Sequence, residues 1–300
     1  MKKRPHFLII RTSSLADVAL SLRVVYPMVR MNPHVRFTFL MKPSITGILV
    51  NAPSNLEAMV IDLDNTDKSI VGLFRFSRKL LYERFSGVID LERSKRSRYI
   101  THVLRTYGRV KTYRISRPEA LHRQSGDHIS FVESERYLHA FEACFQKAGL
   151  LQESLSYHEA VMQVPIYLGR EDAHYEIGLV PFSKADHSVA NLDAALRTKA
   201  ILKESFSLNS VVIGLDKSLS EKIRTTDPLP KDVYPYVSFY EELSMLSRLR
   251  MVVGVDSSRL QMAQLVGVPV VYLQEMPQEK KQIESYILTP FRGLEASVNK

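Results

Sequence analysis

Short apolar runs alternate with longer amphipathic stretches through the N-terminal part of the chain. The mainly apolar segment 7–11 predicts a strand, 17–31 has a helical pattern, and 35–40 alternates apolar and polar side chains like a second strand. The other strands expected here are 59–63, 87–91 and 110–113, and the other helices are 43–51, 67–85 and 94–104. Strands that alternate with helices in this way predict a parallel, doubly wound α/β sheet.

A second alternating unit begins near residue 177. Its expected strands are 177–181, 210–215, 251–256 and 268–273, and its expected helices are 192–203, 239–249 and 260–266. Between the two units, 128–149 has a mainly helical pattern. The sequence therefore predicts two Rossmann-like domains, over 1–165 and 166–300.

The composition is that of a folded protein, since 45% of the residues are hydrophobic and 24% are charged. The single cysteine, Cys144, excludes an internal disulfide, and its apolar helical surroundings predict a buried thiol. No stretch reaches the roughly 18 consecutive apolar residues of a membrane-spanning helix. The first apolar run ends at Ile10, which is too short for a signal peptide. We expect a cytoplasmic protein that contacts a membrane only peripherally.

The net charge of +9 is unevenly divided along the chain. Residues 1–150 carry 25 Lys and Arg against 13 Asp and Glu, whereas residues 151–300 carry 16 against 19. The excess is densest in a basic segment, residues 93–117, which holds nine basic residues, three tyrosines and no acid. Such a segment favours an anionic partner: nucleic acid, a phosphorylated molecule or a membrane surface. A solvated helix face with its loop is the plain structural alternative.

Two hydroxyls and a carboxylate follow the first expected strand. The sequence from Ile9 to Val18 reads IIRTSSLADV and places Ser13, Ser14 and Asp17 in the loop that leaves the strand. Ligands of open parallel sheets bind beyond the carboxyl ends of the strands, so this loop is a candidate site. Asp17 is suited to accept a proton from an attacking hydroxyl. The Ser14-x-x-Asp17 spacing is also that of a helix capping box, and the two interpretations are compatible.

A similar arrangement recurs in the second unit. The segment 251–271 has the pattern of a strand, a polar turn, a short helix and a strand, and its turn contains Asp256, Ser257 and Ser258. Backbone N–H groups at the start of the helix would favour a phosphate there. An ordinary N-cap by Asp256 or Ser257 explains the same pattern equally well.

Several common signatures are missing from the sequence. No Gly-x-Gly-x-x-Gly or Walker sequence occurs, which argues against a conventional dinucleotide enzyme or a P-loop ATPase. None of the nine histidines forms a His-x-x-x-His pair on a convincing helix, and one cysteine cannot make a multi-cysteine metal site. The sequence therefore gives no indication of a resident metal ion.

The two motifs together resemble glycosyltransferase family 9, the lipopolysaccharide heptosyltransferases. The family's opening, approximately I-x-[KR]-x-[ST]-S-[LM]-G-D, is closely met from Ile9 to Asp17. Its later signature, approximately D-[ST]-G-x-x-H-[LI]-A-A-x-x-G-x-P, keeps its frame from Asp256 to Pro269. A weaker third similarity, to the family's D-L-[HQ]-x-x-x-[RK]-[ST] segment, begins at Asp90.

The resemblance implies a GT-B fold, in which two Rossmann-like domains face each other across a cleft. The N-terminal domain would hold an anionic glycolipid acceptor, such as the lipopolysaccharide core or another lipid-linked molecule. The C-terminal domain would hold a nucleotide-sugar donor of the ADP-heptose type. The implied transfer inverts the sugar and needs no metal ion or other cofactor, and it takes place at the inner membrane.

The resemblance also assigns roles to residues of this chain. Asp17 would be the general base. The implied acceptor-binding residues are Ser13, Ser14, Arg93, Arg96 and Arg98. The implied donor-binding residues are Ser183, Lys184, Asp256, Ser257, Ser258, Arg259 and Gln261. In a family member the basic segment would serve a phosphate-bearing acceptor rather than nucleic acid.

Three positions depart from the family patterns. Ala16 replaces the glycine beside the aspartate, Ser258 replaces the glycine of the donor turn, and Gln261 stands in place of a histidine. Glutamine cannot become cationic to offset the charge of a leaving group, but Arg259 is close enough in sequence to supply that charge. The departures keep two other hypotheses open: a catalytically inactive binding protein, and a nucleic-acid-binding protein that uses the basic segment.

Overall fold

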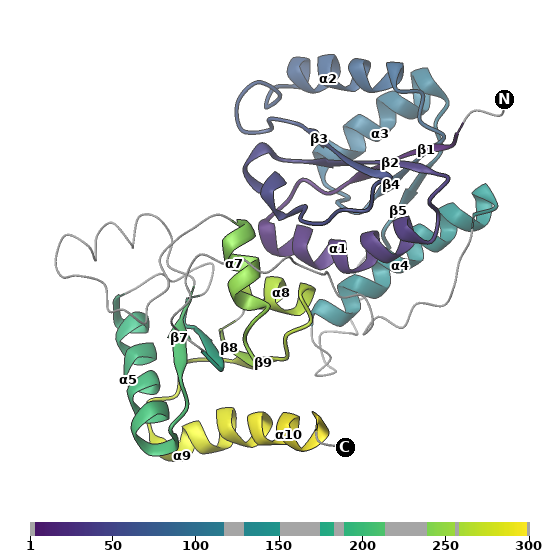
Figure 1. Cartoon of the computed structure of the whole chain (residues 1–300). Coiled ribbons are helices and arrows are strands. Elements are labelled where there is room, and N and C mark those ends of the chain that lie inside the picture. Colours follow the sequence, from purple (N-terminus) through teal and green to yellow (C-terminus); the bar gives the residue numbers. More distant parts are fainter. Residues whose placement is uncertain are drawn as a thin grey trace. The chain divides into compact units, whose positions relative to one another are not determined.

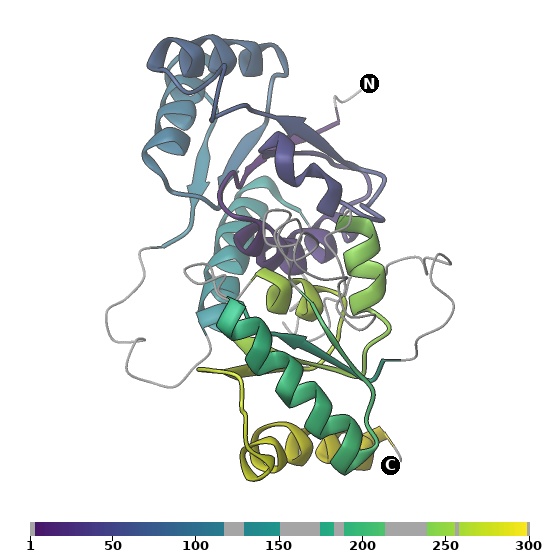
Figure 2. The ribbon, with the colours of Figure 1, turned by 90° about the vertical axis from the view of Figure 1, so that its left-hand side faces the viewer.

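The computed structural model describes residues 4–116, 129–150, 175–182, 189–213, 239–255 and 258–298. The chain divides into two compact units, Met1–Met162 and Gln163–Lys300, and each is described by itself (Figures 1 and 2). The domain boundary predicted after residue 165 lies outside the described residues.

The N-terminal unit is built on a parallel five-stranded sheet in the order β3-β2-β1-β4-β5. Its strands are β1 (His6–Ile10), β2 (Arg36–Met41), β3 (Leu56–Val60), β4 (Gly87–Asp90) and β5 (Thr112–Arg114). Its helices are α1 (Leu15–Arg30), the 3-10 helix η1 (Pro43–Ile48), α2 (Ile70–Tyr82), α3 (Lys95–Gly108) and α4 (Ile129–Ala148). Helices α2 and α3 pack together on one side of the sheet, and α1 and α4 on the other (Figure 1).

Strand β1 lies at the centre of this sheet, between β2 and β4. All five of its side chains are buried, which explains the apolar run from Phe7 to Ile10; the buried His6 ring contacts the Thr38 hydroxyl at 2.8 Å. Ile10 lies opposite Leu40 of β2 and Asp90 of β4, so the three central strands end at the same edge. The loops that begin α1 and α3 both leave from that edge.

The third strand lies at Leu56–Val60 and not at the predicted 59–63. It is an edge strand in which only Leu56 is buried, although four of its five residues are apolar. Ile61 and Leu63 make the following segment look like a strand. Both side chains are buried in the hydrophobic core from the loop that follows β3.

The C-terminal unit is built on a parallel four-stranded sheet in the order β7-β6-β8-β9. Its strands are β6 (Ile177–Val180), β7 (Ser210–Val212), β8 (Met251–Val255) and β9 (Val270–Leu273). Its helices are α5 (Val189–Phe206), α7 (Phe239–Leu246), α8 (Ser258–Leu265), α9 (Lys280–Ile283), the π-helical turn η4 (Glu284–Leu288) and α10 (Thr289–Val298). The sequence pattern predicts none of the last three. Their buried side chains join α5 in the core of the unit.

Two further predictions, a buried cysteine and no membrane-spanning helix, can be compared with the structure. Cys144 of α4 is fully buried beside Phe141 and Phe145, as predicted. Burial raises the pKa of its thiol to about 12, so almost none of it is thiolate at neutral pH. No helix among the described residues is both long enough and apolar enough to cross a membrane.

Candidate active site

The loop after β1 holds Asp17 in the first turn of α1. Ser14 is the N-cap of this helix: its hydroxyl accepts a hydrogen bond from the Asp17 N–H (3.4 Å) and donates one to Asp17 Oδ2 (2.7 Å). The same carboxylate oxygen accepts the Ser14 N–H at 3.3 Å, which completes a capping box. The predicted cap is therefore confirmed, and Asp17 stabilises the helix that it begins.

Arg11 holds the Asp17 carboxylate from another side. Its Nη2 lies 3.2 Å from Asp17 Oδ1, its Nη1 donates to the Leu91 carbonyl oxygen, and its guanidinium lies 5.2 Å from the centre of the Tyr137 ring. Arg11 is buried, whereas the Asp17 side chain is 38% exposed. The ion pair and the hydrogen bonds from Ser14 fix the orientation of the carboxylate, and its exposure leaves it accessible to a substrate hydroxyl.

The loops after β1 and β4 are tied to each other. The Thr12 N–H donates to Glu92 Oε2 at 2.6 Å, and the two strands are neighbours that end in register. Asp17 and Arg93 therefore belong to the same edge of the sheet. This carboxyl edge is where open parallel sheets bind their ligands.

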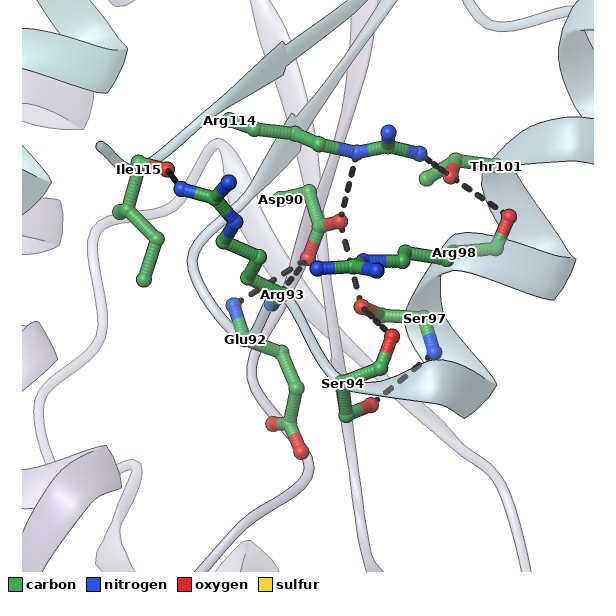
Figure 3. A network of polar contacts seen from close by, with 9 residues as sticks. All are labelled: Asp90, Glu92, Arg93, Ser94, Ser97, Arg98, Thr101, Arg114 and Ile115. Carbon is green, nitrogen blue, oxygen red and sulfur yellow. Dashed lines mark hydrogen bonds and ion pairs between the residues drawn. The ribbon is translucent and has the colours of Figure 1, made fainter. Parts of the chain in front are cut away.

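Asp90, the last residue of β4, organises the start of α3 (Figure 3). Its side chain is completely buried. Oδ1 accepts the backbone N–H groups of Glu92 (3.2 Å) and Arg93 (2.9 Å), and Oδ2 accepts the Ser97 hydroxyl and Arg114 Nε, both at 3.1 Å. One carboxylate thus fixes the turn into α3 and anchors the end of β5.

Replacement of Asp90 by Ala is expected to lower the free energy of unfolding by about 3 kcal/mol, because it removes the buried acceptor of the Glu92 and Arg93 N–H groups and leaves the Ser97 hydroxyl with the Ser94 carbonyl alone. Arg114 is partly exposed and adds little to this cost. Urea unfolding followed by circular dichroism measures the loss. Asp64→Ala, which removes the exposed partner of Lys42, is a control expected to cost less than about 1 kcal/mol. Equal losses in the two variants would contradict the organising role of Asp90.

The three arginines of the predicted acceptor site take different positions. Arg93 has a left-handed backbone (φ 54°), and its Nη1 donates to the Ile115 carbonyl oxygen at 3.1 Å (Figure 3). Arg96 is half-buried in the first turn of α3. Arg98 is exposed and lines a cavity of about 510 Å³ between α3 and β5. The other residues that line this cavity are Lys95, Tyr99, Thr101, His102, Arg105, Thr112 and Arg114.

The turn after β8 is described only in part. Ser258 begins α8, and Gly254 lies within β8. A Cβ added to Gly254 would lie 2.1 Å from the Val180 carbonyl oxygen, so glycine is required where β6 and β8 approach each other. Four predicted donor-binding residues lie outside the described residues; they are Ser183, Lys184, Asp256 and Ser257.

Arg259 and Gln261 both have partners within the C-terminal unit. Arg259 Nε donates to Glu242 Oε1 of α7 at 2.9 Å, and the two side chains are only 15% and 5% exposed. Gln261 is buried, and its Nε2 donates to the Tyr272 hydroxyl of β9 at 2.9 Å. The charge of Arg259 is therefore already balanced by a carboxylate.

Several residues that shape these loops have no role predicted from the sequence. Arg11 and Asp90 stand inside the two N-terminal motifs, and a charged residue at the carboxyl end of a buried strand is a signal that points to them. Glu242 and Tyr272 give no such signal. Their partners are distant in sequence, and only the packing of α7, α8 and β9 brings them together.

Neither a family model nor a curated protein matches the sequence, but solved structures match its fold. A family 9 glycosyltransferase from Veillonella parvula aligns over 91% of this chain and 82% of its own, with a TM-score of 0.64 and 16% identity. The E. coli heptosyltransferase WaaC, solved with ADP, aligns over 97% and 99%, with a TM-score of 0.66 and 13% identity. E. coli ADP-heptose lipopolysaccharide heptosyltransferase II aligns over 89% and 84%, with a TM-score of 0.61 and 13% identity.

At these identities the likeness shows the fold. Two parallel sheets with interleaved helices, shared with these enzymes, make the α/β GT-B fold, so the predicted fold class is confirmed. The resemblance to glycosyltransferase family 9 is confirmed at the same level, that of the fold.

Proposed function

We propose that this chain is a family 9 glycosyltransferase. It would move a heptose or a similar sugar from a nucleotide-sugar of the ADP-heptose type to the lipopolysaccharide core or another lipid-linked acceptor. The observation that carries the proposal is Asp17, a partly exposed carboxylate held by Arg11 and Ser14 at the end of the central strand. The family motifs, which run in the same order, and the fold shared with heptosyltransferases support it.

In the proposed reaction Asp17 is the general base. The acceptor hydroxyl gives its proton to the Asp17 carboxylate while its oxygen forms a bond to the anomeric carbon of the donor sugar. On the opposite face, the bond from that carbon to the diphosphate oxygen breaks, and its electron pair leaves with the nucleoside diphosphate. The configuration at the anomeric carbon is thereby inverted. Arg11 orients the carboxylate for the transfer.

The N-terminal unit would bind the acceptor. Its positive charge suits a glycolipid that carries phosphates or acidic sugars, and four of the eight residues that line the cavity beside β5 are Lys or Arg. Such an acceptor would hold the protein peripherally at the cytoplasmic surface of the inner membrane. The residues assigned to it in this proposal are Ser13, Ser14, Arg93, Arg96 and Arg98.

The C-terminal unit would bind the donor without a metal ion. Backbone N–H groups at the start of α8, where Ser258 stands, are suited to a diphosphate. Among the residues that the structure describes, no group of three or more His, Cys, Asp or Glu side chains could hold a metal ion. The other residues assigned to the donor are Ser183, Lys184, Asp256, Ser257, Arg259 and Gln261.

A catalytically inactive family member that acts as a binding protein is the second candidate. The observation that favours it is that Arg259 and Gln261, which follow the donor turn on α8, both bind other side chains of the protein. Arg259 pairs with Glu242, and the Gln261 amide donates to Tyr272. Both groups that would assist a leaving diphosphate are thus engaged within the protein.

Thermal unfolding with ADP-, GDP- and UDP-sugars tests the donor side of the proposal. A donor at about 100 times its Kd stabilises the folded chain by about 2.7 kcal/mol, which corresponds to a rise in Tm of roughly 5–10 °C. We expect the largest rise with an ADP-sugar, and release of ADP once a lipopolysaccharide-type acceptor is added. No rise with any of the three sugars would favour the inactive family member.

A further inference from the structure

Helix α2 turns large apolar side chains toward solvent. Ile70 and Val71 are 73% and 69% exposed, and Phe74 and Tyr82 are exposed as well. The opposite side of the helix packs into the core of the N-terminal unit, so these four side chains are not needed to fill it. Exposed apolar side chains that gather on one element mark an interaction surface.

The first turn of α2 is held in place. Ser69 is its N-cap, and the Ser69 hydroxyl accepts the Gly72 N–H at 3.0 Å. A Cβ at position 72 would lie 2.5 Å from the Thr66 carbonyl oxygen, so glycine lets the preceding loop pack against this turn. Ile70 and Val71 therefore protrude from a capped and packed turn and not from a frayed helix end.

Helices α2 and α3 contain no acidic residue. They pack side by side on the same side of the sheet (Figures 1 and 2). Their basic residues, all exposed except the half-buried Arg96, are Arg75, Arg78, Lys79, Lys95, Arg96, Arg98 and Arg105. We call these seven residues, with Ile70, Val71, Phe74 and Tyr82, the α2–α3 surface.

We infer that the α2–α3 surface docks on an anionic membrane. A helix at a membrane interface places apolar side chains at the boundary between headgroups and acyl chains, while Lys and Arg contact lipid phosphates. The outer side of α2 offers both kinds of side chain, and the absence of acids from the two helices complements a negative lipid surface. A nucleic acid would satisfy the charges alone and would leave the apolar side chains without a role.

Docking in this way would bring the membrane to the candidate active site. In a parallel sheet each helix that follows a strand begins at the carboxyl edge, so the first turns of α1, α2 and α3 lie along one edge of the unit. Asp17 lies in the first turn of α1, and Ile70 in the first turn of α2. The value of this arrangement for catalysis rests on the proposed function, since a lipid-linked acceptor already resides in the membrane.

Co-sedimentation of the full chain with lipid vesicles tests the docking, without donor or acceptor. We expect binding to vesicles that contain phosphatidylglycerol and little binding to pure phosphatidylcholine vesicles. The triple variant R75Q/R78Q/K79Q should bind the anionic vesicles roughly 100-fold more weakly, at about fivefold for each charge. A wild-type chain that does not bind these vesicles, or that binds phosphatidylcholine equally well, would overturn the inference.

The apolar part of the surface needs its own variant. I70S/V71S/Y82S keeps every charge and removes only side chains that are at least 69% exposed, so it should fold normally and bind anionic vesicles roughly tenfold more weakly. Unchanged binding by this variant would mean that no side chain inserts, and the inference would fail. The inference would also fail if the wild-type chain preferred single-stranded nucleic acid to vesicles in a competition experiment.

A matched control separates the surface from the net charge. R197Q/K203Q/K281Q removes the same number of charges from the C-terminal unit and should bind vesicles like the wild type. Equal weakening by this control would overturn the assignment to α2 and α3. Transfer to a soluble, deacylated acceptor, measured on the same variants, reports on the proposed function separately, because it needs no membrane.

Discussion

The Asp17→Asn variant is expected to transfer sugar about 10³-fold more slowly than the wild type, because the amide cannot take up the proton of the acceptor hydroxyl. Asparagine keeps an oxygen that accepts the Ser14 N–H, so the start of α1 is largely preserved. The lost ion pair with Arg11 involves a partly exposed carboxylate and should cost about 1 kcal/mol of stability. Initial rates at saturating donor and soluble acceptor measure the chemical effect.

Two further measurements separate catalysis by Asp17 from its role as a cap. Ser69→Ala removes the N-cap of α2 at a similar cost of about 1 kcal/mol, and it should retain transfer to a soluble acceptor. Calorimetric titration of Asp17→Asn with the donor should give the wild-type affinity. A rate for Asp17→Asn within tenfold of the wild-type rate would remove Asp17 as the base.

The central strands and the helices that follow them are predictable because their pattern is set locally. A strand buried on both faces is mostly apolar, as β1 is from Phe7 to Ile10, and the polar loop after it marks where it ends. The bounds of the edge strand β3 cannot be predicted in this way. The apolar residues that follow it, Ile61 and Leu63, belong to a loop that enters the core. The elements after β9 escape prediction because α9 and η4 are short, so neither shows a sustained helical period.

In the candidate site, too, contacts between residues close in sequence are predictable and contacts between distant residues are not. The Ser14–Asp17 cap joins residues three apart, so its spacing alone predicts it. The contact of Arg11 with Tyr137 depends on the packing of α4 against the sheet, and no local pattern carries it. The periodicity of α2 likewise predicts a helix, but it does not say that Phe74 faces solvent. The distribution of charge, in contrast, is predictable, because the basic segment can be recognised in the sequence alone.

The Arg259→Met variant is expected to lower the free energy of unfolding of the C-terminal unit by about 4 kcal/mol, because it leaves the Glu242 carboxylate buried without a partner. The corresponding fall in Tm is roughly 10 °C. Urea unfolding of Arg259→Met, and of Glu242→Met beside it, measures the loss. A variant as stable as the wild type would mean that water reaches Glu242 and that the pair is not a buried one.

The double variant Glu242→Met/Arg259→Met should recover most of that stability, since it buries no charge and keeps two long side chains between α7 and α8. Comparing the two single variants with the double variant gives the coupling energy of the pair. The double variant also tests the role of Arg259 toward the donor. If its guanidinium contacts the leaving diphosphate, affinity for the nucleotide-sugar falls in a chain of near-normal stability. Unchanged affinity would remove Arg259 from the donor-binding residues and leave it as a partner of Glu242 alone.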